Sequence, residues 1–181
     1  KQDSKRTESR KKRLTELYRV CKKEESQWIQ ELSETLAGHE ENQLRSDKLY
    51  LYYTQMGRCM YSGEVIPIED LWDNTKYDID HIYPQSKTMD DSLDNRVLVK
   101  KEYNAKKSDH YPLSAEIQKK CGAFWKMLWS KGFISKNKYD RLIRKEALTA
   151  TELAGFIERQ IVETRQSTKS VAEILKEALP Q

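Results

Sequence analysis

Asp80 and His81 are adjacent side chains whose types could do chemistry together. They lie in a run that ends at a proline, Tyr77-Asp78-Ile79-Asp80-His81-Ile82-Tyr83-Pro84. A carboxylate is a hard oxygen ligand for a divalent cation, and an imidazole can take a proton from water near neutral pH. The simpler interpretation is that His81 is a core histidine, and its position alone favours that reading. The neighbouring carboxylate is the reason to consider metal-assisted chemistry instead.

The elements around this pair must bring it into one site. Neighbouring residues on a regular strand point to opposite faces, so Asp80 and His81 can share a site only where the chain bends or bulges. Pro84 follows closely and makes a bend plausible. We expect a strand over 77–82, a polar loop over 85–94, a second strand over 96–99 and a short helix over 100–107. Further β-prone pieces lie at 59–61 and 64–68.

Helical patterns flank this segment on both sides. Apolar residues at three- and four-residue spacing predict helix over 7–36, broken once, and a second helix over 42–56 that is closed by Gly57. After the motif, Ser114 and Ser135 are expected to start helices, and Thr151 to cap a last one that is interrupted at 164–170. The expected fold class is α+β and mostly helical, with a short antiparallel two-stranded sheet.

Charge is distributed unevenly along the 181 residues, although the net charge is only +4. Residues 59–99 contain three basic and nine acidic side chains, whereas 100–145 contain thirteen basic and four acidic ones. An acidic middle that binds a cation beside a basic flank that binds a polyanion would explain this pattern. Solvated lysine-rich helices would explain the basic flank equally well.

Composition also excludes some classes of protein. No apolar run approaches the ~20 residues that a membrane-spanning helix needs. The three cysteines, Cys21, Cys59 and Cys121, form no C-x-x-C pair, so we expect neither a disulfide framework nor a structural zinc, and a reducing compartment. The chain begins with Lys1 and is expected to be part of something larger.

Three short motifs carry a family resemblance. They are Asp78-Ile79-Asp80-His81-Ile82-Tyr83-Pro84-Gln85-Ser86, then Asp91-Ser92-Leu93-Asp94-Asn95-Arg96-Val97-Leu98, then Asn104-Ala105-Lys106-Lys107-Ser108. Together they resemble the HNH (ββα-metal) nuclease motif, and more narrowly the HNH domain of type II CRISPR RNA-guided DNA endonucleases. Flanking segments agree, including Lys48 to Tyr53 and Gly155 to Gln166.

The resemblance implies a role for each motif residue. It makes His81 the general base, Asp80 and Asn104 metal ligands, and Asn95 the residue that fixes the loop carrying His81. Lys107 would lie near the cleaved phosphate. A carboxylate and an amide oxygen suit Mg²⁺ or Mn²⁺ as the cofactor.

The resemblance also implies domains and partners. Residues 1–44 would be a charged helical linker, 45–150 the HNH nuclease domain, and 151–181 a helical linker toward a RuvC-like domain. The partners would be guide RNA, the target DNA strand paired to it, and the other domains of a monomeric enzyme of CRISPR antiviral defence in the bacterial cytoplasm. Two alternatives remain at this point: a non-catalytic nucleic-acid-binding helical module, and a free-standing HNH homing or restriction endonuclease.

Overall fold

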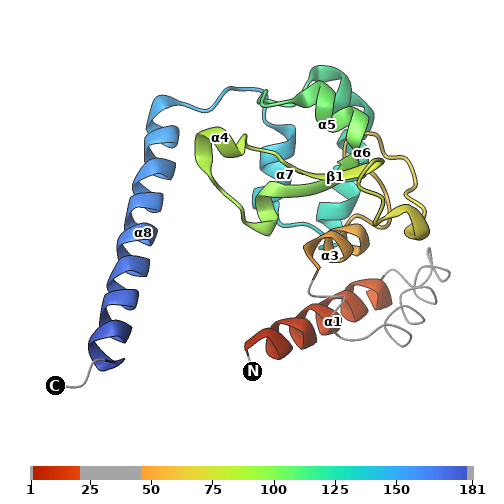
Figure 1. Cartoon of the computed structure of the whole chain (residues 1–181). Helices are drawn as coiled ribbons and strands as arrows, with labels where there is room; N and C mark the ends of the chain where they lie inside the picture. Colours follow the sequence, from red (N-terminus) through yellow and green to blue (C-terminus); the bar gives the residue numbers. More distant parts are fainter. Residues whose placement is uncertain (1, 21–45, 179–181) are drawn as a thin grey trace.

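A two-stranded antiparallel sheet surrounded by helices forms the centre of the molecule (Figure 1). The computed structural model describes residues 2–20 and 46–178. Strand β1 (Tyr77–His81) pairs with β2 (Arg96–Lys100), and the register sets Asp80 opposite Val97 and His81 opposite Arg96. Helix α5 (Lys101–Lys107) follows β2 directly and packs on both strands. This is the expected order of strand, connection, strand and helix.

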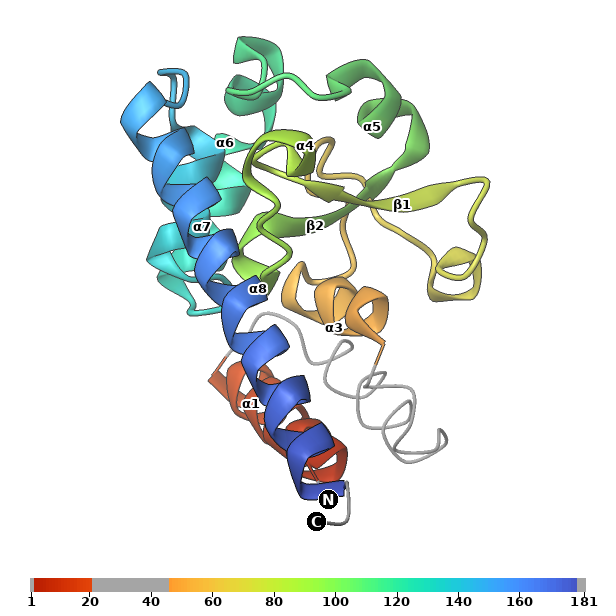
Figure 2. The same cartoon turned by 60° about the vertical axis from the view of Figure 1, so that its left-hand side comes forward.

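The other elements build the core around this unit. They are α1 (Gln2–Val20), α3 (Asp47–Thr54), η2 (Ile68–Asp70), α4 (Gln85–Thr88), η3 (Leu93–Asn95), α6 (Ala115–Ser130), α7 (Lys136–Ile143) and α8 (Ala150–Ala178). Helices α3 and α5 lie on opposite sides of the strands (Figures 1 and 2). The largest fully buried side chains are Trp125, Tyr53, Tyr61 and Phe133. Aromatic rings bury much apolar area each, which compensates for the modest hydrophobic content.

Local signals set several helix boundaries. Ser114 accepts a hydrogen bond from the Ile117 amide and Ser135 accepts one from the Lys138 amide, as N-cap residues do. Gly57 adopts φ +66° just after α3, a conformation that costs glycine little. The two serine starts confirm the sequence-based expectation. The helix expected over 42–56 ends earlier, at Thr54 with Gln55 as its C-cap, and residues 42–45 lie outside the described part. In the expected 7–36 helix, the structure describes only α1, and the rest of it lies outside the described residues.

Two expected strands are absent from the described part of the chain. Residues 58–65 instead form a tight turn with one isolated bridge, between Arg58 and Val65, and η2 begins at Ile68. Gly63 at φ +72° reverses the chain, and its amide bonds back to the Cys59 carbonyl at 2.8 Å. The turn prevents the two β-prone pieces from extending.

The last helix also differs from the expectation. It begins at Ala150 after a capping box, in which the Thr149 hydroxyl accepts from the Glu152 amide and the Glu152 carboxylate accepts from the Thr149 amide. The expected cap at Thr151 is therefore wrong. Helix α8 also runs unbroken through 164–170, because the Ser and Thr residues there only weaken a helix and neither Gly nor Pro breaks it.

Helix α8 leaves the core as a long rod (Figure 1). Its first turns are fixed to the core, since Phe156 packs edge-on against Tyr83 with ring centroids 5.8 Å apart. Arg144 forms a bidentate ion pair with Glu152 at 2.6 and 2.7 Å. No helix among the described residues is long and apolar enough to cross a membrane.

Candidate active site

Asp80 is the buried carboxylate at the centre of the site. Its side chain sits at the end of β1 and the residue is 8% exposed. Its Oδ2 accepts a hydrogen bond from the Tyr61 hydroxyl at 2.7 Å and lies 3.0 Å from the Lys107 ammonium. Burial, with the Asp80 charge adding to it, raises the pKa of Tyr61, so this hydroxyl stays protonated and donates. The partners of Asp80 among the described residues both bind Oδ2, which leaves Oδ1 open.

Helix α5 lies along β1 so that two of its residues meet two alternate residues of the strand. Lys107 pairs with Asp80, and the Asn104 amide nitrogen donates to Asp78 Oδ2 at 3.3 Å. Three residues advance a helix by about 4.5 Å and two residues advance a strand by about 6.6 Å, so these pairs can form together. Because Asn104 uses its nitrogen for Asp78, its amide oxygen has no hydrogen-bond partner among the described residues.

The side chain of His81 has a different partner from that of Asp80, although Lys107 contacts both residues. Its Nε2 lies 2.8 Å from Asp91 Oδ1, and its backbone carbonyl accepts from the Lys107 ammonium at 2.9 Å. The side chain of His81 is 21% exposed, so water can reach the ring. The described ladder is regular through the His81–Arg96 pair, without the bulge that the sequence analysis considered.

Asn95 fastens the connection between the two strands. We call residues 82–95 the turn segment. The Asn95 side chain is fully buried, accepts from the Tyr83 amide at 2.8 Å, and donates to the carbonyls of Tyr83 and Asp90 at 3.0 and 2.8 Å. One amide side chain thus holds both ends of the turn segment that follows His81.

Two further side chains hold the turn segment from helix α7. Arg141 pairs with Asp90 at 2.7 Å, and the Lys138 ammonium donates to the carbonyls of Leu93 and Arg96 at 3.1 and 2.6 Å. Burial lowers the pKa of Lys138 to about 7, and the nearby Asp94 opposes that shift. The turn segment is therefore tied to the helical core.

Comparison with known proteins identifies this arrangement. A family model described as HNH endonuclease matches residues 59–113. The CRISPR-associated endonuclease Cas9 of Streptococcus mutans is 48% identical over 140 residues, which are 76% of this chain and 10% of that protein. The Cas9 of Listeria innocua is 47% identical over 135 residues, 74% of this chain and 10% of that protein. The Cas9 of Staphylococcus aureus is 36% identical over 140 residues, 72% of this chain and 13% of that protein.

The chain belongs to the HNH endonuclease family. It is an HNH domain of the type II CRISPR kind, with the small ββα core that the sequence predicted. The chain spans about a tenth of the length of these curated relatives.

The structure brings together some of the predicted site residues of this HNH domain and keeps others apart. Asp80 and Lys107 are in contact, whereas Asn104 contacts Asp78 and His81 contacts Asp91. The roles inferred for these residues from the resemblance stay predictions.

Sequence reasoning assigned no role to Tyr61, Asp78 or Asp91. The two-residue step between Asp78 and Asp80 could have signalled a shared strand face. No local pattern reveals Tyr61, which reaches Asp80 across 19 residues of chain, or Asp91, which lies in the turn segment.

The oxygen donors of the HNH domain fit a small divalent cation. Among the described residues, no three His, Cys, Asp or Glu side chains gather as a metal cage. Asp80 Oδ1 and the Asn104 amide oxygen remain as open hard donors on neighbouring elements. Mg²⁺ commonly binds through one or two carboxylates and keeps several waters, so a donor set of this size suits it. The Cys59 sulfur is not an open donor of this kind, because the residue is fully buried and its sulfur accepts a hydrogen bond from the Lys100 amide.

Proposed function

We propose that this HNH domain is the metal-dependent nuclease module that hydrolyses the DNA strand paired to a guide RNA. The observations that carry the proposal are the open oxygens of Asp80 and Asn104 and the water-accessible imidazole of His81, the next residue after Asp80 in β1. Phosphodiester hydrolysis needs an activated water and a stabiliser for charge on the phosphate and the leaving oxygen. A bound Mg²⁺ or Mn²⁺ would supply the charge stabilisation.

The chain's own residues then have separate roles. His81 takes a proton from the attacking water, and its ring is held in place by Asp91. Asp80 and Asn104 hold the cation, with Asp78 orienting the Asn104 amide by accepting its N–H. Lys107 balances the buried Asp80 charge, and in this proposal its ammonium also contacts a phosphate oxygen. Asn95 keeps the turn segment, and therefore His81, in position.

The charge distribution supports a nucleic-acid substrate. The excess of basic residues over 100–145 includes α5, which carries Asn104 and Lys107. Lysine contacts to phosphates position a duplex without reading its sequence. In this proposal guide RNA pairing selects the strand, residues 45–150 form the nuclease domain, and the flanking 1–44 and 151–181 are linkers to the rest of a monomeric bacterial enzyme.

The decisive experiment replaces His81 in a guide-loaded, full-length enzyme that contains this chain. We expect His81→Ala to lower the rate of target-strand cutting by at least about 100-fold while DNA binding is retained, because only proton transfer is removed. His39→Ala is the matched control, since it removes an imidazole that lies outside the motif. Unchanged target-strand nicking in His81→Ala would refute the proposal and favour a non-catalytic binding module.

A further inference from the structure

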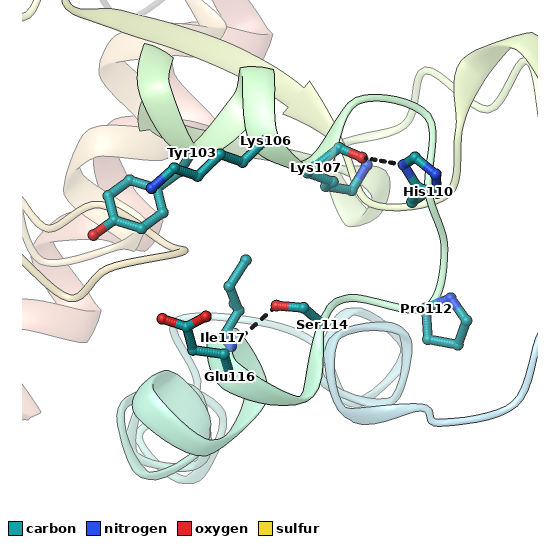
Figure 3. Close-up of a pocket in the computed structure, with 8 residues that line it drawn as sticks. All are labelled: Tyr103, Lys106, Lys107, His110, Pro112, Ser114, Glu116 and Ile117. Atoms are coloured by element: carbon teal, nitrogen blue, oxygen red, sulfur yellow. Dashed lines mark hydrogen bonds between the residues drawn. The ribbon is translucent and has the colours of Figure 1, made fainter.

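A cavity of about 350 Å³ lies between α5 and the start of α6, beside the candidate active site. Figure 3 shows that the side chains of α5 face those of the first turn of α6 across this space. Its lining residues combine basic, aromatic and apolar side chains: Tyr103, Lys106, Lys107, His110, Pro112, Ser114, Glu116 and Ile117. A cavity of this volume is large enough for a small organic ligand.

Tyr103 forms an aromatic wall of this cavity, and two lysine ammonium groups lie near its ring. The ammonium of Lys106 lies 5.5 Å from the centre of the Tyr103 ring, and that of Lys120 lies 5.6 Å from it. Lys120 also donates to the Tyr103 hydroxyl at 3.4 Å, and this hydrogen bond raises the pKa of Lys120 and keeps it charged. An aromatic ring beside ammonium groups suits a ligand that has both a flat or apolar part and a negative charge.

The remaining walls complete this chemistry. Ile117 and Pro112 supply apolar surface, and Glu116 is the one acidic residue among those lining the cavity. The His110 Nδ1 lies 3.0 Å from the Lys107 carbonyl and must donate to it, because a carbonyl only accepts. The other ring nitrogen of His110 has no hydrogen-bond partner within residues 2–20 and 46–178.

Lys107 joins the cavity to the active site. It lines the cavity, yet its ammonium bonds Asp80 and the His81 carbonyl. Asn104 and Lys107 face β1, whereas Tyr103 and Lys106 lie one residue earlier on the helix and line the adjoining face. Helix α5 has seven residues and is only about 10 Å long. Successive nucleotides rise about 3.4 Å along a duplex, so the length of α5 corresponds to about three nucleotide steps.

We propose that this cavity holds a nucleotide of the strand being cut, within three positions of the cleaved bond. Its phosphate would lie against Lys106, and its sugar or base against the Tyr103 ring. The inference rests on the proposed function, since it deepens the description of the same site. It makes Tyr103 and Lys106 substrate-positioning residues, distinct from the residues that hold the cation.

Photo-crosslinking tests the proposal with the native cavity intact. A single 5-iododeoxyuridine is placed at each target-strand position around the cleaved bond, and the duplex is bound to a guide-loaded, full-length enzyme that contains this chain. The enzyme carries His81→Ala so that the strand stays whole. We expect a crosslink to Tyr103, mapped by mass spectrometry, only from positions within three nucleotides of the bond. Crosslinks to Tyr103 from more distant positions alone, or from none, would overturn the proposal.

Kinetics supply the second arm of the test. Tyr103→Ala and Lys106→Ala should each lower the single-turnover rate of target-strand cutting about 10-fold, with DNA binding by the whole enzyme unchanged. Lys101→Ala is the control, because that ammonium sits at the other end of α5 and bonds the Asn74 carbonyl. Rates equal to the control in both variants would also overturn the cavity assignment. If Tyr103→Ala and Lys106→Ala cut at the control rate while His81→Ala is inactive, the cavity assignment fails and the proposed function stands. If His81→Ala is fully active, both the proposed function and the cavity assignment fail.

Discussion

The turn segment and helix α5 both adjoin β1, but they differ in how completely the polar side chains beside them are hydrogen bonded. In the turn segment, the Asn95 amide is paired at both its oxygen and its nitrogen. On the α5 side, Asp80 and Asn104 each leave one oxygen without a partner among the described residues. A fully paired polar network is rigid, whereas open oxygens can accept new ligands. The HNH domain therefore has a closed polar network in the turn segment and open oxygens at Asp80 and Asn104.

Each of these two regions also contains a buried lysine. Lys107 on the α5 side faces a carboxylate, 3.0 Å away, and its side chain is 2% exposed. Lys107 also donates to the His81 carbonyl, whereas Lys138 behind the turn segment donates to two backbone carbonyls and forms no ion pair within the described residues. The first ammonium is therefore part of an ion pair. The second ammonium is a structural donor that ties α7 to the turn segment.

Breaking the ion pair on the α5 side should have the largest effect on stability. Asp80→Ala leaves the Lys107 charge buried and unpaired, and we expect the free energy of unfolding to fall by about 3–5 kcal/mol. The double variant Asp80→Ala with Lys107→Met should recover a large part of that loss, because it removes the orphaned charge. Urea unfolding of this chain measures both values.

The control for this experiment is Asp78→Ala on the same strand. Asp78 accepts a hydrogen bond from the Asn104 amide, and losing it should cost only about 1 kcal/mol. Equal losses in Asp80→Ala and in the double variant would show that the ion pair contributes nothing, and the contrast between the two lysines would disappear.

The turn segment should respond to the loss of its amide anchor. Asn95→Ala leaves the Tyr83 amide and two carbonyls without partners in a buried position, and we expect a loss of roughly 2–4 kcal/mol. Amide hydrogen exchange at Tyr83 should accelerate more than at Val99 in the middle of the ladder. Uniform acceleration at both amides would mean that Asn95 supports the whole fold instead of the turn segment in particular.

The sequence predicted the order of the central elements because each leaves a local signal. A compact apolar run marks β2, Pro84 follows the first strand, and the serine caps start α6 and α7. The pieces at 59–61 and 64–68 carry similar β-prone residues, but the turn at Gly63 limits their pairing to one isolated bridge, between Arg58 and Val65. Local propensity was overridden there by a turn whose hydrogen bonds close on themselves.

The candidate site was predictable only as far as its motif extended. Asp80, His81, Asn95, Asn104 and Lys107 were named from the motif, but the partners that tune them come from elsewhere in the chain. Tyr61 reaches Asp80 from the turn before β1, and Lys138 reaches the turn segment from α7. Contacts of this kind depend on tertiary packing, which no spacing rule in a single sequence encodes. The same holds for the cavity beside α5, whose walls come from two helices.

The lysine behind the turn segment should give the smallest effect, and one that depends on pH. Burial holds the pKa of Lys138 at about 7 in the folded chain, against an ordinary value of 10.5. Below pH 7 both the folded and the unfolded chain carry this proton. Above pH 7 the folded chain loses it first, so the unfolded chain binds more protons and the free energy of unfolding rises with pH.

Comparison with Lys138→Met isolates this contribution. Between pH 7 and pH 9, urea unfolding should show the unsubstituted chain gaining stability relative to the variant, by at most about 1.4 kcal/mol per pH unit. The charged groups around the ammonium are Asp94, which favours its charged form, and Arg13, Arg96 and Arg141, which oppose it. All four residues are present in both proteins, so the difference between the two pH curves reports on Lys138. If the free energy of unfolding changes with pH equally in the two proteins, Lys138 stays charged in the folded chain. The contrast between Lys138 and the ion-paired Lys107 would then be wrong.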